Sequence, residues 1–81
     1  MDIKEWLFGW FGQHSSFSAA DLAAASNKNY LDAGIIDSFA FVQLLSDIDD
    51  EYDIVFTNDD FLDPRFSSID GLALMIGERI V

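Results

Sequence analysis

The hydrophobic positions of this chain repeat with a helical period in three separate segments. Over about residues 2–13, apolar side chains recur every three or four residues, which places them on one face of a helix. The same spacing returns over about residues 38–52 and about residues 68–80. The predicted inner faces consist of Ile3, Trp6, Leu7, Trp10 and Phe11, then of Phe41, Leu44, Leu45, Ile48 and Tyr52, and finally of Ile69, Leu72, Ala73, Ile76 and Ile80.

Short polar residues mark the start of each predicted helix. Asp2 precedes the first, Asp37 precedes the second, and Ser67 or Ser68 precedes the third. Such side chains accept hydrogen bonds from the free N–H groups of a first helical turn. Two glycines inside the last segment lower its helix propensity, so this helix is expected to depend on tertiary contacts.

The segments between these helices carry weaker signals. The first connection, 14–37, is long for a link between packed helices, and long loops are often functional. Ser18 followed by Asp21 predicts a short helical turn inside it. Residues 57–62 predict a cap and one short helical turn, which Pro64 stops. The residues expected to hold the second half of the first connection against the core are Tyr30, Leu31, Ile35 and Ile36.

These patterns predict an all-α domain. We expect a four-helix bundle with three longer helices, one short third helix and a long first loop, formed by the whole chain of 81 residues. With 51% hydrophobic residues and no cysteine, its core has to be held by packing, without disulfides or thiolate metal sites. No apolar run approaches the roughly 20 residues of a membrane helix, and no signal segment is visible, so we expect a cytoplasmic monomer without membrane insertion.

The charge of the chain limits its partners. Fifteen acidic and four basic residues give a formal net charge of −11. Such a chain repels phosphate backbones, so nucleic acid is not expected as a partner. Proteins with basic patches are favoured, because opposite charge accelerates their encounter.

No catalytic constellation is visible, and an enzyme is not expected. A serine nucleophile needs a base, yet the single histidine, His14, is predicted to be a solvated residue at a helix end, and no Gly-x-Ser-x-Gly elbow occurs. The acidic run 47–53 has the alternating carboxylates of a calcium loop, but Tyr52 and Asn58 stand where an EF-hand needs Gly and Glu. A divalent-cation-binding helical protein therefore stays as a weaker alternative.

The segment Gly34-Ile35-Ile36-Asp37-Ser38-Phe39 attracts attention because a serine opens an amphipathic helix. Such a serine is most often a simple cap. Here, however, Asp37 already fits the cap position, which leaves the hydroxyl of Ser38 free in the first turn. The positive end of the helix dipole suits a phosphate ester at that hydroxyl. Gly34 is expected to supply a backbone conformation that a residue with a Cβ resists.

The stretch from Tyr30 to Tyr52, YLDAGIIDSFAFVQLLSDIDDEY, resembles the attachment region of the acyl carrier protein family. The resemblance implies that a phosphopantetheinyl transferase attaches 4'-phosphopantetheine from coenzyme A to Ser38. The thiol of this arm would then carry acyl or aminoacyl groups as thioesters. Implied partners are an acyl- or aminoacyl-loading ligase and synthase or transferase enzymes with basic docking patches.

The resemblance also implies a docking surface on the second of the longer helices. The matching positions are Asp37, Phe39, Gln43, Asp49 and Asp50. Among them Phe39 is expected to be an exposed apolar anchor, because other residues already define the inner face of this helix.

Departures from the common pattern point to a specialised stand-alone carrier. In fatty-acid carriers the glycine lies three residues before the serine, whereas here that place is Ile35 and Gly34 lies one residue earlier. Phe39 also replaces the usual leucine. The sequence GIIDSF is more similar to D-alanyl carriers and carriers of biosynthetic clusters. The alternative is a carrier-fold protein–protein interaction module that is never modified.

Overall fold

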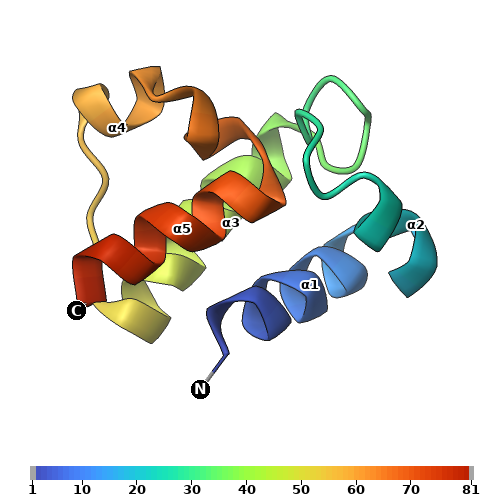
Figure 1. Cartoon of the computed structure of the whole chain (residues 1–81), viewed down its shortest axis with the longest axis horizontal. Coiled ribbons are helices and arrows are strands. Elements are labelled where there is room, and N and C mark those ends of the chain that lie inside the picture. Colours follow the sequence, from blue (N-terminus) through green and yellow to red (C-terminus); the bar gives the residue numbers. More distant parts are fainter. Residues whose placement is uncertain (1, 81) are drawn as a thin grey trace.

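The computed structural model describes residues 2–80, and every regular element in this range is helical (Figure 1). The all-α class and the three longer helices are confirmed, each with ends within one residue of the prediction. The chain contains more helical segments than the four predicted, because a short helix lies inside the first connection and a 3-10 helix precedes the last helix. In order, the elements are α1 (Ile3–His14), α2 (Ala19–Ala24), α3 (Ser38–Tyr52), α4 (Asn58–Leu62), η1 (Pro64–Ser67) and α5 (Ile69–Ile80).

The expected caps begin these helices. Asp2 and Asp37 each accept a hydrogen bond at 2.9 Å from a backbone N–H in the first turn of α1 and α3. Ser18 caps α2, as its spacing to the first acidic residue of that helix predicts. Of the two serines considered for the last helix, Ser68 is the cap, since its Oγ accepts from the N–H of Gly71 at 3.0 Å.

The short helix α4 ends before Pro64 as predicted, and Pro64 also begins a further helical segment. The last residue of α4 is Leu62, and the chain then continues as the 3-10 helix η1 with Pro64 in its first turn. A proline is tolerated there, because the N–H that it lacks has no partner in a first turn. The chain therefore bends at Asp63, which has an extended backbone, and resumes helical structure at Pro64.

The predicted inner faces supply half of the buried side chains of the core. Leu7, Leu44, Ile48, Leu72 and Ile76 are fully buried, and the other predicted residues are buried or pack against them, with one exception in α5. This exception is Ile80, which is 47% exposed, and in the first connection Leu31 is 41% exposed, so both were wrongly predicted to be core. Periodicity places a residue on a helix face, but burial also needs an element that covers that position.

Aromatic rings form a continuous run of contacts through this core. Tyr30 from the first connection lies between a ring of α1 and a ring of α3, and Phe66 of η1 continues the run toward α4. The ring centroids are 5.3 Å apart for Phe11–Tyr30, 6.1 Å for Tyr30–Phe41, 5.8 Å for Phe41–Phe66, 4.9 Å for Phe56–Phe66 and 5.0 Å for Phe61–Phe66.

Tyr30 also anchors the first connection through its polar atoms. Its hydroxyl donates to the carbonyl of Phe66 at 2.6 Å, and its N–H donates to the carbonyl of Ser67 at 3.0 Å. Its own carbonyl accepts from the N–H groups of Ile35 and Ile36. The side chain is fully buried, and this burial raises the pKa of Tyr30, so the hydroxyl stays protonated and keeps donating. One residue thus joins η1 to the segment that leads into α3.

Gly71 permits the close approach of α5 to η1. A Cβ at this position would lie 2.1 Å from the carbonyl oxygen of Arg65 and 2.6 Å from its Cα. Because the clash is with backbone, no side-chain rotation can relieve it. Gly77, six residues further along α5, is different, since a Cβ there would meet only a side-chain atom of Ile3 at 3.7 Å.

Ion pairs join the helices at the surface. Lys4 of α1 binds Asp70 of α5 at 2.8 Å, and its hydrogen bond lowers the pKa of Asp70. Around η1 and α4, the pairs are Arg65 with Asp63 at 2.9 Å, Arg65 with Glu78 at 2.8 Å, and Arg79 with Asp60. Hydrogen bonds from these arginines lower the pKa of Asp60, Asp63 and Glu78 as well.

Among residues 2–80, no helix combines the length and the apolar character needed to cross a membrane.

Replacing Gly71 by Ala should destabilise the fold by about 3 kcal/mol or more, because the new methyl group would overlap backbone atoms of η1. Gly77→Ala is the matched control in the same helix and should stabilise the chain by ~0.5–1 kcal/mol through helix propensity. Urea unfolding followed by circular dichroism measures both. Equal stability of the two variants would contradict the close approach.

Tyr30→Phe should cost ~1–3 kcal/mol, because it leaves the buried carbonyl of Phe66 without its donor. Local opening should increase as well. The amides of Ile35 and Ile36 should therefore exchange hydrogen faster in the variant than in the wild type, with a larger change than at amides in the middle of α1. Hydrogen exchange measured by NMR tests this, and unchanged exchange at both amides would show that the hydroxyl does not hold the loop.

Candidate functional site

The candidate site lies where the first connection enters α3. Gly34 has a φ of +74°, the left-handed region that favours glycine, and nothing lies within 4 Å of a Cβ built there. Its role is therefore conformational, as predicted. Ile35 and Ile36 follow and are buried, which presses the chain against the core just before Asp37 and Ser38 emerge at the surface.

Ser38 presents an unengaged hydroxyl at the start of α3. The residue is exposed, and within residues 2–80 its Oγ makes no hydrogen bond. The carboxylate of Asp37 is occupied with the N–H of Ala40 at 2.9 Å. The N–H groups of Ser38 and Phe39 have no protein partner in the described range, so the positive end of the helix remains open to an anion.

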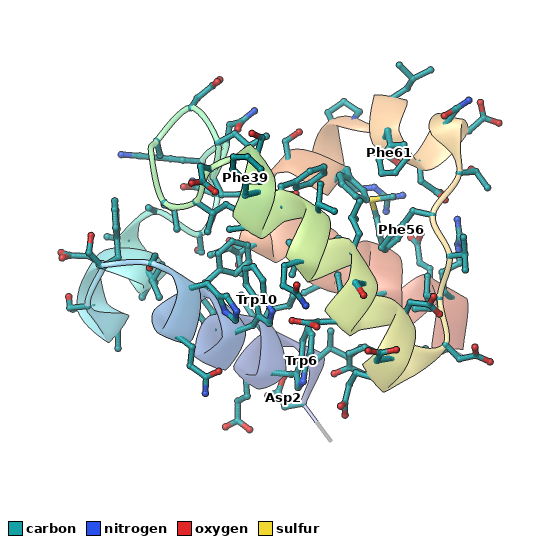
Figure 2. The ribbon with its side chains drawn as sticks, turned by 180° about the vertical axis from the view of Figure 1, so that it is seen from behind. Asp2, Trp6, Trp10, Phe39, Phe56 and Phe61 are labelled. Carbon is teal, nitrogen blue, oxygen red and sulfur yellow. The ribbon has the colours of Figure 1, made fainter. Side chains whose placement is uncertain are left out.

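An exposed apolar strip follows the serine on the outer face of α3. Phe39 is 87% exposed and Val42 is 65% exposed, and neither contributes to the core. Figure 2 shows Phe39 beside the loop at the start of α3, far from Trp6 and Asp2 at the other end of this view. The outward placement of Phe39 agrees with the prediction. Val42 was not predicted, although its spacing of three residues from Phe39 places it on the same face.

The other predicted docking residues of α3 lie at different distances from Phe39, and the exposed Gln43, four residues on, shares its face. Asp50 is exposed but lies eleven residues along the helix, which corresponds to about 16 Å of rise. Asp49 is half-buried and turns toward α4, where it lines a hollow with Phe56 and Phe61. The exposed Gln43 donates its amide to Asp47 at 2.7 Å and is therefore already engaged within α3.

The electrostatic surface around α3 is strongly acidic, since most cations of the chain are engaged elsewhere. Lys4, Arg65 and Arg79 form the ion pairs between helices. Within the described range, Lys28 is the single lysine or arginine without an ion-pair partner, and it lies in the first connection. A partner that docks on α3 consequently meets carboxylates and exposed apolar side chains.

Neither hydrolytic nor metal chemistry is supported by the neighbours of Ser38. His14 is exposed at the end of α1, as predicted, with its ring stacked on Trp10 at 3.9 Å and its Nδ1 2.8 Å from the carbonyl of Trp10. It lines a shallow hollow with Asp37, but no hydrogen bond in residues 2–80 joins it to Ser38. In the same range, no three histidine, aspartate or glutamate side chains gather in a way that could hold a metal ion.

Comparisons with known proteins add no family to these observations. No family model matches the chain, and neither a curated protein nor a solved structure matches it.

Proposed function

We propose that the chain is a carrier domain of the acyl carrier type, with Ser38 as the attachment point of 4'-phosphopantetheine. The observation that carries the proposal is the exposed, unengaged hydroxyl of Ser38 at the first position of a 15-residue helix. Because Asp37 performs the capping, modification of Ser38 would cost the fold no hydrogen bond. The protein would act in the cytoplasm as a monomer and would itself catalyse nothing.

The surroundings of Ser38 fit a phosphodiester. The free N–H groups at the start of α3 and the helix dipole favour the negative charge of the ester. The arm supplies a flexible thiol that holds acyl or aminoacyl groups as thioesters and raises their concentration near each partner. The base that takes the proton of the Ser38 hydroxyl would come from the phosphopantetheinyl transferase.

The acidic surface supports the predicted classes of partner. Loading ligases, synthases and transferases with basic patches would be attracted to the carboxylates of α3, and Phe39 with Val42 would supply the apolar contact. The departures of the sequence from fatty-acid carriers favour a specialised pathway. The cargo would be selected by the loading enzyme.

A second candidate is an interaction module with the same docking surface and no arm. It is favoured by the apolar strip of Phe39 and Val42, which stays exposed in the isolated chain and would be covered in a complex. This candidate and the carrier differ in one observable, the mass of the chain after exposure to a transferase.

Incubation with coenzyme A, magnesium and a promiscuous phosphopantetheinyl transferase should add one phosphopantetheine to the wild-type chain, as read by intact mass spectrometry. Ser38→Ala should gain nothing while keeping its stability within about 0.5 kcal/mol, because the side chain is exposed and makes no contact of consequence. Ser46→Ala, an exposed serine in the same helix, is the matched control and should be modified like the wild type. No increment with several transferases, or an increment on Ser38→Ala, would refute the carrier proposal.

Phe39→Ala should leave the fold intact but slow modification about tenfold, the loss of ~1.4 kcal/mol that an apolar interface anchor typically supplies. Leu62→Ala is its control, because Leu62 is a similarly exposed apolar side chain, 80% exposed, on a different helix, α4. The rates are read from the time course of the mass increment. Equal rates for the two variants would remove Phe39 from the docking surface.

A further inference from the structure

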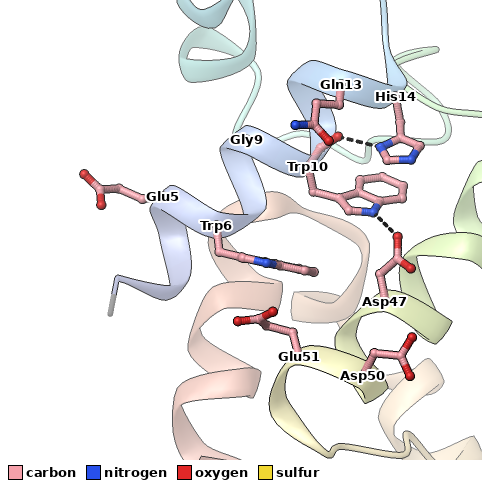
Figure 3. A pocket seen from close by; sticks show the side chains of 9 residues that line it. All are labelled: Glu5, Trp6, Gly9, Trp10, Gln13, His14, Asp47, Asp50 and Glu51. Carbon is pink, nitrogen blue, oxygen red and sulfur yellow. Dashed lines mark hydrogen bonds between the residues drawn. The ribbon is translucent and has the colours of Figure 1, made fainter.

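A hollow with aromatic walls lies between α1 and α3, on the side of α3 that faces α1 (Figure 3). Two indoles project from α1 toward α3, where Asp47 reaches Trp10 and Glu51 lies near Trp6, as the close view shows, whereas the carboxylate of Asp50 points away from the indoles. The residues that define it are Glu5, Trp6, Trp10, Asp47, Asp50 and Glu51.

The aromatic walls are held in place. Trp10 donates its Nε1–H to Asp47 at 2.6 Å, and the ring of His14 stacks on it with planes 12° apart. Trp6 packs edge-on against Tyr52 of α3, with centroids 5.5 Å apart. Gly9 lies between the two indoles along α1, and nothing stands within 4 Å of a Cβ built on it, so the back of the hollow is open. Rigid indoles beside an open back make a preformed surface for a planar group.

The charge of the hollow is uncompensated by the chain itself. Glu5, Asp47, Asp50 and Glu51 line it, whereas no lysine or arginine does. Three of the chain's four basic residues pair with carboxylates elsewhere. Asp47 already accepts from Trp10 and Gln43, which leaves Glu5, Asp50 and Glu51 without an ion pair in residues 2–80. The carboxylates of Glu5 and Asp50 point away from the indoles, so the hollow combines aromatic faces with one available acceptor beside them, Glu51.

We propose that this hollow binds the guanidinium group of an arginine presented by a partner protein. A guanidinium is planar, stacks on aromatic faces and donates in a fork that matches carboxylates, so it uses both features of the hollow. A metal ion would need the carboxylates to converge, and within the described range they do not. A lysine ammonium would use the charges but would gain less from the indoles. The site is thus an arginine socket for a basic partner surface.

The arginine socket does not depend on an arm at Ser38. It is made by α1 and the second half of α3, whereas Ser38 and Phe39 lie at the first turn of α3. A partner that fills the socket would lie along the same helix that carries Ser38 in its first turn. The test can consequently be made with Ser38→Ala, so that failure of the carrier proposal leaves the result unaffected.

The probe is the capped peptide acetyl-Gly-Arg-Gly-amide, titrated into ¹⁵N-labelled Ser38→Ala chain at low salt and followed by NMR. Saturable shifts are expected at the indole N–H signals of Trp6 and Trp10 and in the second half of α3. The neutral isostere with citrulline in place of arginine should not produce them, and added salt should reduce them. The lysine peptide should bind at least threefold more weakly than the arginine peptide.

Variants separate the socket from general attraction to an acidic protein. Glu51→Gln, introduced into the Ser38→Ala chain, should weaken binding of the arginine peptide several-fold. Asp21→Asn removes one negative charge from α2 instead and should leave the affinity nearly unchanged. Trp6→Phe should weaken binding as well, by reducing the stacking face. Shifts that do not saturate, shifts spread over all acidic segments, equal binding of the lysine peptide, or equal effects of Glu51→Gln and Asp21→Asn would each overturn the proposal.

Discussion

The buried side chain of Tyr30 is the contact on which the placement of the candidate site depends. Its hydroxyl and its N–H bind two successive carbonyls of η1, and its carbonyl receives the two amides that precede Asp37. Its ring lies between Phe11 of α1 and Phe41 of α3. Because a buried hydroxyl without a partner would be costly, the loop has one favourable position. The start of α3, and with it Ser38, is therefore presented by a fixed loop.

The distribution of charge separates the scaffold from the surface offered to partners. Arg65 and Arg79 join α4, η1 and α5, and Lys4 joins α1 to α5, so all three cations are paired with carboxylates of the fold. What remains around α3 is carboxylate, exposed Phe39 and Val42 at one end, and the indole-walled hollow toward α1. Both surfaces suit a basic partner, and their common location on α3 would allow one partner to contact both.

Local sequence was sufficient for the elements and their caps. The three- and four-residue spacing of apolar positions located α1, α3 and α5 to within one residue, and Asp2, Asp37 and Ser18 stand at helix starts as expected. The exposed Phe39 was also predictable, since the inner face of α3 was complete without it. These features depend on interactions between residues a few positions apart, so the sequence alone is enough to predict them.

The tertiary structure decided what depends on distant neighbours. Leu31 and Ile80 satisfy the apolar pattern but remain exposed, because no element covers them. The hydrogen bond from Gln43 to Asp47 also appears only in the folded helix. From the sequence, Gly71 was expected only to lower the helix propensity of α5. In the fold it allows the backbone of η1 to lie where a Cβ would otherwise be. The hollow between α1 and α3 likewise exists only after residues far apart in sequence meet. The sequence by itself determined the helices and the serine at the start of α3. The packing determined which faces are free, because exposure is a property of the assembled surface.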